Sequence, residues 1–93
     1  MESPEARIKR LMMRSMRRGI KEMDLILHDF ARRHLTTMTA AEIAAYDALL
    51  EENDHDLYHW VSGQGAAPAR FAVLVARIAA GARGISGTPS VER

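Results

Sequence analysis

The sequence predicts an all-α protein, a compact bundle of five short helices followed by a flexible tail. Apolar residues recur at helical spacing over most of the chain, and no stretch alternates with a period of two for long enough to form a strand. A chain of 93 residues has room for one domain with a modest core. We therefore expect a single five-helix domain over residues 1–84 and a flexible tail over residues 85–93.

The first two helices follow from the spacing of apolar residues. Residues 5–16 are expected to form the first helix, and Pro4 suits its first turn. Gly19 is expected to break or re-cap the chain, so that a second helix runs from about residue 19 to residue 34. The expected apolar faces are Ile8, Leu11, Met12 and Met16 in the first helix, and Ile20, Met23, Ile26, Leu27 and Phe30 in the second.

A capping motif predicts the start of the third helix. Thr39, with Glu42 three residues later, matches the capping box in which each residue's side chain binds the other's backbone N–H. The helix is expected to end near residues 52–53. Its predicted apolar face consists of Ile43, Tyr46, Leu49 and Leu50.

Two more helices complete the bundle. Asp54 is expected to be the N-cap of a short fourth helix over residues 54–61. Pro68 is expected to open the fifth helix, and Gly81 and Gly84 to end it. The tail that follows contains Gly, Ser, Thr and Pro without periodicity, which is why we expect it to be flexible.

Composition and charge limit the possible functions. The chain has no cysteine, which excludes disulfides, thiol catalysis and thiolate metal sites. No apolar run approaches the roughly 20 residues of a membrane span, and the N-terminal residues do not resemble a signal peptide, so we expect neither membrane insertion nor export. Charge is segregated: residues 1–39 carry a net charge of +4 and residues 40–60 a net charge of −6. These regions can steer a partner or face each other within the fold.

Candidate catalytic and metal-binding residues are few. His55 and His59 share a helix face, but no third ligand is evident and the glutamate of a zinc protease motif is absent, so we predict no metal site. Asp54, Leu57 and Trp60 are assigned structural roles, as helix start and core residues. The acidic cluster could do acid–base chemistry, although capping and solvation explain it more simply. It consists of Glu51, Glu52, Asp54 and Asp56.

The basic first helix supports an alternative function. Seven lysines and arginines fall within residues 7–21, and two helices joined by a turn could form a helix-turn-helix. A small basic helical nucleic-acid-binding protein is therefore the alternative interpretation. Against it, the acidic middle would repel phosphate, and no other helix is basic.

The stretch RRGIKEMD, residues 17–24, is not explained by stability alone. If this stretch is helical, Arg18 and Glu22 lie four apart on one face, with Gly19 as a flat spot beside them. Glycine inside a helix costs about 1 kcal/mol relative to alanine, and an exposed ion pair returns at most about that amount. A contact surface that another backbone approaches closely is one explanation. A simple break between two helices with solvated arginines is the other, and the residues alone do not decide between them.

Residues 17–24 resemble the Arg-Gly-x-x-Glu signature of the succinate dehydrogenase flavinylation factors, the flavinator family. Residues 46–51 are similar to the family's third-helix pattern, and residues 54–60 resemble its Asp-x-Asp-Leu-x-x-Trp block. The resemblance covers roughly residues 7–80. It implies a five-helix assembly chaperone, not an enzyme, that helps the flavoprotein subunit of succinate dehydrogenase, or of fumarate reductase, attach FAD covalently to one of its own histidines.

The resemblance also implies a contact site. The family motif assigns partner binding to Arg18, Gly19 and Glu22, and Arg17 and Asp24 belong to the same block. We hypothesise that Gly19 admits the partner backbone, that Arg18 pairs with a partner carboxylate or carbonyl, and that Glu22 positions Arg18 or pairs across the interface. On this hypothesis Gly19→Arg abolishes flavinylation and leaves folding nearly unchanged.

The remaining expectations concern the cofactor, the oligomeric state, the partners and the location of the protein. No cofactor is expected to be stably bound; FAD is the group attached to the partner, and direct binding of FAD is left open. We expect a monomer when the protein is free, no nucleic-acid partner, and a bacterial cytoplasmic location, or the mitochondrial matrix if the source is eukaryotic.

Overall fold

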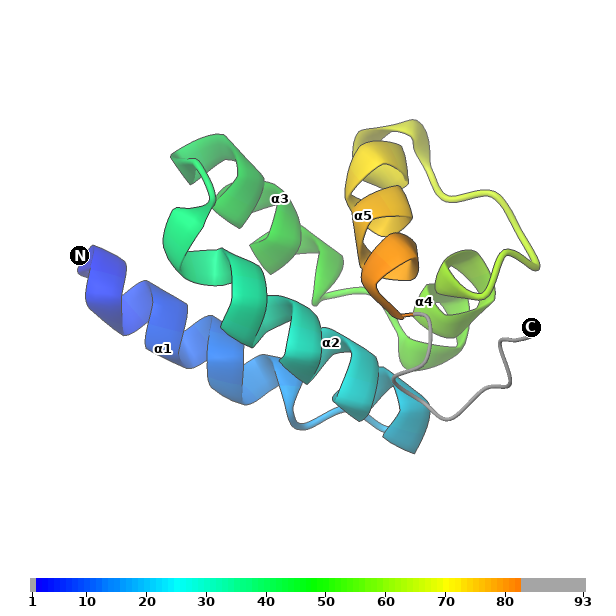
Figure 1. Cartoon of the computed structure of the whole chain (residues 1–93), viewed down its shortest axis with the longest axis horizontal. Helices are drawn as coiled ribbons and strands as arrows, with labels where there is room; N and C mark the ends of the chain where they lie inside the picture. The colour runs from blue at the N-terminus through cyan, green and yellow to red at the C-terminus, as the bar shows by residue number, and fades with distance from the viewer. Residues whose placement is uncertain (1, 83–93) are drawn as a thin grey trace.

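The computed structural model describes residues 2–82, and within them the protein is built from helices without strands. The α-helices are α1 (Pro4–Ser15), α2 (Lys21–His34), α3 (Ala40–Leu49), α4 (Asp54–Val61) and α5 (Ala72–Ala82), with short 3₁₀ turns at η1 (Leu35–Thr37) and η2 (Ala69–Phe71). In Figure 1, α1 and α2 lie alongside each other, and α4 and α5 pack against α2. Helix α3 packs against α5, and its Asp47 pairs with Arg10 of α1. The all-α, five-helix prediction is confirmed; the flexible tail predicted over residues 85–93 lies outside the described residues.

Two helix starts follow the predicted capping chemistry. Pro4 occupies the first turn of α1, whose N-cap Ser3 accepts a hydrogen bond from the Ala6 N–H at 3.1 Å. At α3 the Glu42 N–H donates to Thr39 Oγ1 at 3.1 Å, and the Thr39 N–H donates to Glu42 Oε1 at 2.8 Å. The capping box predicted from the sequence is therefore confirmed.

Several predicted boundaries are wrong by a few residues. Helix α2 begins at Lys21, not near residue 19, because the backbone of Ile20 is extended. Helix α3 ends at Leu49, earlier than predicted. The N-cap of α4 is Asn53, because its side-chain oxygen accepts the Asp56 N–H at 2.8 Å.

The last helix also differs from its prediction at both ends. Pro68 precedes the 3₁₀ turn Ala69–Phe71, and the regular helix begins only at Ala72. Gly81 lies inside α5, which continues to Ala82. The helix stop predicted at Gly81 is therefore wrong, and the stop predicted at Gly84 falls outside the described residues.

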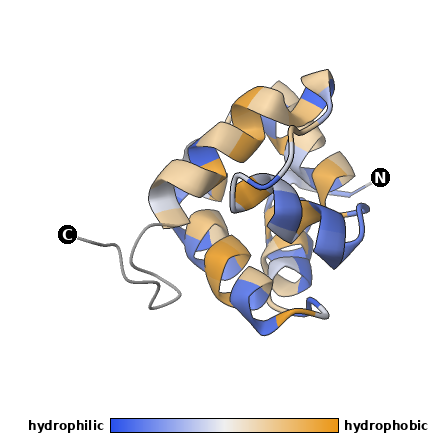
Figure 2. Ribbon diagram, turned by 90° about the vertical axis from the view of Figure 1, so that its right-hand side faces the viewer, coloured by the Kyte–Doolittle hydropathy of each residue, from blue (hydrophilic) through white to orange (hydrophobic). Residues whose placement is uncertain are grey.

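One hydrophobic core joins all five helices, with α2 at its centre. Buried apolar side chains of the helices meet in this core, and Figure 2 shows hydrophobic and hydrophilic residues interspersed along the helices. Phe30 and Tyr46 pack with ring centroids 5.6 Å apart. The fully buried large side chains include Leu11, Met23, Leu27, Leu35, Tyr46, Leu49, Leu50, Leu57, Phe71 and Ile78. Among the described residues, no helix is both long enough and apolar enough to cross a bilayer.

A buried polar contact fixes α1 against α2 and α3. The Tyr46 hydroxyl lies 2.7 Å from Ser15 Oγ and 3.3 Å from the carbonyl oxygen of Leu27. The Ser15 hydroxyl also lies 2.7 Å from the Leu11 carbonyl oxygen. Burial raises the pKa of Tyr46 to about 12, so the phenol stays neutral in the folded protein. These bonds satisfy polar groups inside the core and set how the three helices sit together.

Candidate functional site

The first part of RRGIKEMD forms a tight connection between two helices. Helix α1 ends at Ser15 and α2 starts at Lys21, so Arg18 lies outside both helices. The helical pairing of Arg18 with Glu22, considered from the sequence, therefore does not occur. Arg18 pairs instead with Asp54, at the start of α4.

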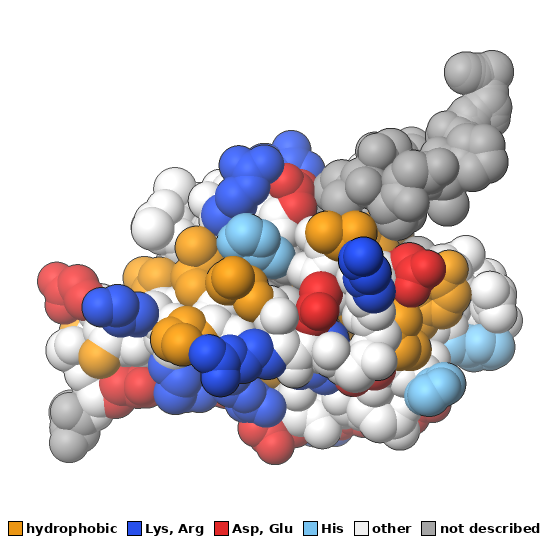
Figure 3. All heavy atoms as spheres, turned by 90° about the horizontal axis from the view of Figure 1, so that it is seen from below, with side chains coloured by type: hydrophobic (Ala, Val, Ile, Leu, Met, Phe, Trp, Pro, Cys, Tyr) orange, Lys and Arg blue, Asp and Glu red, His pale blue; other side chains and the backbone are white. Residues whose placement is uncertain are grey.

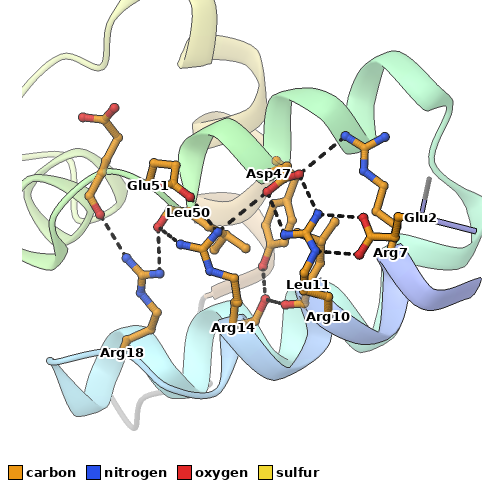
Figure 4. Close-up of polar contacts among 12 residues, drawn as sticks. Glu2, Arg7, Arg10, Leu11, Arg14, Arg18, Asp47, Leu50 and Glu51 are labelled. Atoms are coloured by element: carbon orange, nitrogen blue, oxygen red, sulfur yellow. Dashed lines mark hydrogen bonds and ion pairs between the residues drawn. The ribbon is translucent and has the colours of Figure 1, made fainter. Parts of the chain in front are cut away.

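The Arg18 side chain is nearly buried and makes its hydrogen bonds to other residues of the protein. Its exposed fraction is 8%, and its Nε donates to Asp54 Oδ1 at 2.7 Å. The two other guanidinium nitrogens donate to the carbonyl oxygens of Leu50 and Glu52, each at 3.0 Å. Figure 4 shows Arg18 reaching across to the end of α3. Because these carbonyls follow the last turn of α3, Arg18 satisfies acceptors that no helical N–H reaches.

Gly19 makes a close approach, but to the protein's own carboxylate. The Gly19 N–H donates to Asp54 Oδ2 at 2.5 Å. A Cβ atom added at Gly19 would lie 2.9 Å from the same oxygen, closer than such atoms ordinarily come. The glycine therefore lets the connection sit directly on Asp54, whose two carboxylate oxygens are both occupied.

The remaining motif residues divide into internal and exposed positions. Asp24 accepts the backbone N–H of Arg18 and thereby closes the connection onto the first turn of α2. Arg17 and Glu22 are exposed, and neither makes a side-chain hydrogen bond or ion pair with another residue in the range 2–82. The block thus combines three residues that build the connection, Arg18, Gly19 and Asp24, with two that face solvent.

The basic face of α1 is largely neutralised by α3. Arg10 binds Asp47 at 2.9 Å and Glu2 at 2.7 Å, and Arg14 binds Glu51 at 2.7 Å. Hydrogen bonds from Arg10 hold the pKa of Asp47 below its usual range. Figure 4 shows these arginines extending in one direction, from α1 toward α3. The basic and acidic regions of the sequence therefore face each other, which weakens the electrostatic case for nucleic-acid binding.

The acidic cluster is occupied in the same way. Glu51 pairs with an arginine of α1, Glu52 lies 3.4 Å from Arg70, and Asp56 binds the side chain of Asn53 at 3.0 Å. Together with Asp54, these residues link or cap helices. The geometry supports a structural interpretation of the cluster over acid–base chemistry.

The other predicted site residues lie around α4. Leu57 is fully buried, and the half-buried Trp60 packs against Phe71 with ring centroids 6.3 Å apart. His59 lies against Gly65, where an added Cβ would come within 2.4 Å of the imidazole ring. Within residues 2–82, no group of three or more His, Asp or Glu side chains is arranged to hold a metal ion.

Comparison with known proteins identifies the family. The family model described as "Flavinator of succinate dehydrogenase" matches residues 9–82. The chain belongs to this family. The matched region contains both RRGIKEMD and the block at residues 54–60, so the resemblance inferred from these motifs is confirmed.

Curated relatives within the flavinator family have a consistent name. The chain is 49% identical over 61 residues to "Succinate dehydrogenase assembly factor 2, mitochondrial" of Candida glabrata, covering 66% of this chain and 40% of that protein. The protein of the same name from Komagataella phaffii is 48% identical over 59 residues, covering 63% and 31%. That from Schizosaccharomyces pombe is 37% identical over 70 residues, covering 75% and 50%. The chain therefore spans half or less of the length of these relatives.

The ion pairs that hold the motif connection and α1 in place were not predicted from the sequence. The pairing of Arg18 with Asp54 joins residues 36 positions apart, and that of Arg10 with Asp47 joins residues 37 apart. One signal was available: basic residues at 10, 14 and 18 and acidic residues at 47, 51 and 54 have similar spacing. Arg10 and Asp47 align between α1 and α3, and the pairing continues past the end of α3 to Glu51 and then to Arg18 and Asp54.

Proposed function

We propose that this protein binds the flavoprotein subunit of succinate dehydrogenase and promotes covalent attachment of FAD to it. Membership of the flavinator family and the printed names of the relatives support this role. The structural observation that carries it is the connection over residues 16–20, held by the contacts of Arg18 and Gly19 with Asp54 and lying beside the exposed Arg17 and Glu22. A surface ordered before binding loses little conformational entropy when a partner docks.

In this proposal the protein acts as an assembly factor and the flavoprotein forms the bond to its own flavin. The roles of the motif residues differ. Arg18, Gly19 and Asp24 build the connection, whereas Arg17 and Glu22 make charged contacts to the partner. This arrangement replaces the hypothesis that Arg18 itself reaches a partner carboxylate, because each of its three guanidinium nitrogens already donates within the protein and the side chain is nearly buried.

The proposal also covers the role of FAD, a second candidate partner, the oligomeric state and the compartment. FAD enters as the group attached to the partner, and the flavoprotein of fumarate reductase is a second candidate partner of the same class. We assign the free protein as a monomer. Its compartment is the one in which the flavoprotein is assembled: the mitochondrial matrix in a eukaryote, as the names of the relatives suggest, or the cytoplasm of a bacterium.

The test is covalent flavin fluorescence of the denatured flavoprotein subunit, expressed in cells that lack their own factor. We expect the signal to rise when this protein is present. The double variant Arg17→Ala/Glu22→Ala should lower it about tenfold, because two exposed contacts to the partner are lost. Gly19→Arg does not separate binding from folding, because any side chain at Gly19 meets Asp54.

A control variant distinguishes loss of the site from loss of charge. Arg32→Ala removes an exposed arginine of α2 whose ion pair is with Asp29, on the same helix. It should leave flavin attachment unchanged. Absence of any rise in covalent flavin, with the protein folded and soluble, would refute the proposed function.

A further inference from the structure

A groove runs along α1 and ends at the motif connection. It has a volume of about 560 Å³. Its lining residues form two rows with a spacing of four along the chain. The first row is Ala6, Arg10, Arg14 and Arg18; the second is Lys9, Met13 and Arg17.

The two rows differ in how their charges are used. The arginines of the first row bind carboxylates of α3, α4 and the residues near them. Lys9 and Arg17, in the second row, form no ion pair with residues 2–82. No acidic residue lines the groove. Its edge therefore carries two positive charges that the described part of the chain does not neutralise.

An apolar side chain separates these two cations. Met13 is 47% exposed, a large fraction for a methionine, and its flexible thioether adapts to many apolar partners. Figure 3 shows hydrophobic and basic side chains side by side over α1 and α2 on the face seen from below. The second row thus reads cation, apolar, cation from Lys9 to Arg17.

The spacing of this row matches an extended peptide. Lys9 and Met13 lie four residues apart in α1, a rise of about 6 Å. Arg17 follows four residues later, just beyond the end of α1, where its N–H still donates to the Arg14 carbonyl at 3.3 Å. In an extended strand, side chains on one face recur every second residue, at about 6.6 Å. Three alternate residues of an extended segment can therefore meet the three side chains in register.

We infer that this groove binds an extended acidic segment of the flavoprotein subunit, in which an apolar residue lies between two carboxylates at alternate positions. The inference rests on the proposed function and adds the chemistry of the segment recognised. Two carboxylates complement Lys9 and Arg17, and the apolar residue covers Met13. The groove is continuous with the motif, since Arg17 belongs to both.

The direct test is photo-crosslinking from the position of Met13. The full chain carries p-benzoylphenylalanine in place of Met13, and is irradiated with the purified flavoprotein subunit before flavin is attached. We expect adducts in a segment with the acidic-x-apolar-x-acidic pattern, located by digestion and mass spectrometry. Val73, which is 76% exposed on α5, provides the matched control position and should give no specific adduct.

The outcomes separate the groove from the proposed function. A second probe at Glu22 reports docking of the motif itself. Adducts from Glu22 without adducts from Met13 would be consistent with the proposed function but would refute binding of a partner segment in the groove. Adducts from Met13 to a segment without that pattern, or to a second copy of this chain, would overturn it as well. No adduct from either probe, together with no gain in covalent flavin, would refute the proposed function and therefore also the inferred binding of a partner segment in the groove.

Charge reversal gives an independent measurement. Lys9→Glu should raise the Kd for the flavoprotein subunit roughly fivefold to tenfold, and the loss should shrink at high salt. Arg32→Glu, the same reversal on another helix, should leave the Kd unchanged. Replacing a carboxylate of the cross-linked segment by lysine should restore binding to the Lys9→Glu variant. Equal affinities of Lys9→Glu and the unmodified protein would exclude Lys9 from the interface and overturn the inference.

Discussion

Replacing Arg18 by alanine should destabilise the fold. The change removes three hydrogen bonds, to Asp54 at 2.7 Å and to the carbonyls of Leu50 and Glu52 at 3.0 Å each. Breaking a buried ion pair from one side costs about 3–5 kcal/mol. Asp54 retains 19% exposure and its bond from Gly19, so we expect the lower end, about 3 kcal/mol.

Urea unfolding followed by circular dichroism measures this loss. With a slope of about 1.5 kcal/mol per molar urea, a loss of about 3 kcal/mol lowers the midpoint by about 2 M. Arg17→Ala is the matched control, because the neighbouring arginine is exposed and unpaired within residues 2–82; it should change stability by less than about 0.5 kcal/mol. If Arg18→Ala also changes stability by less than about 0.5 kcal/mol, the assignment of Arg18 to the fold is refuted.

Three further perturbations test neighbouring contacts. Gly19→Ala should lower the free energy of unfolding by about 1–2 kcal/mol, and much less in an Asp54→Ala background, which a double-mutant cycle measures. Burial raises the pKa of Tyr46 to about 12, so the stability contributed by the neutral phenol should be fully present below pH 10 and lost between pH 10 and 12. Tyr46→Phe should remove this alkaline loss, which thermal melts at a series of pH values measure. Hydrogen bonds from Arg10 lower the pKa of Asp47, so stability from this group is present above about pH 4 and lost on acidification; Asp47→Asn should flatten the acid limb of the same series.

Local sequence signals predicted the helices well because their causes are local. The Thr39–Glu42 capping box and the position of Pro4 involve residues within one helical turn, and both were read correctly. Boundaries were less certain where neighbouring residues compete for one role. Asn53 and Asp54 can each cap α4, and Asn53 does so. The Asp54 carboxylate instead accepts hydrogen bonds from Arg18 and Gly19, which the local sequence does not reveal.

The candidate site was only partly predictable, for the same reason. The motif resemblance located the right segment, and the family match contains it. The roles within the segment depend on contacts across more than 30 residues, such as that between Arg18 and Asp54. A glycine that admits a partner backbone and one that admits Asp54 look identical in sequence, and the structure favours the second explanation for Gly19.

On the proposed function, this division of roles changes how variants of the motif should be interpreted. Loss of flavin attachment after substitution of Arg18 or Gly19 can result from a displaced connection, even if neither residue touches the partner. Variants at Arg17 or Glu22 leave the internal contacts intact and therefore report more directly on binding. A variant series that measures stability and flavin attachment together separates the two causes: positions that build the connection should lose both, whereas positions that contact the partner should lose flavin attachment alone.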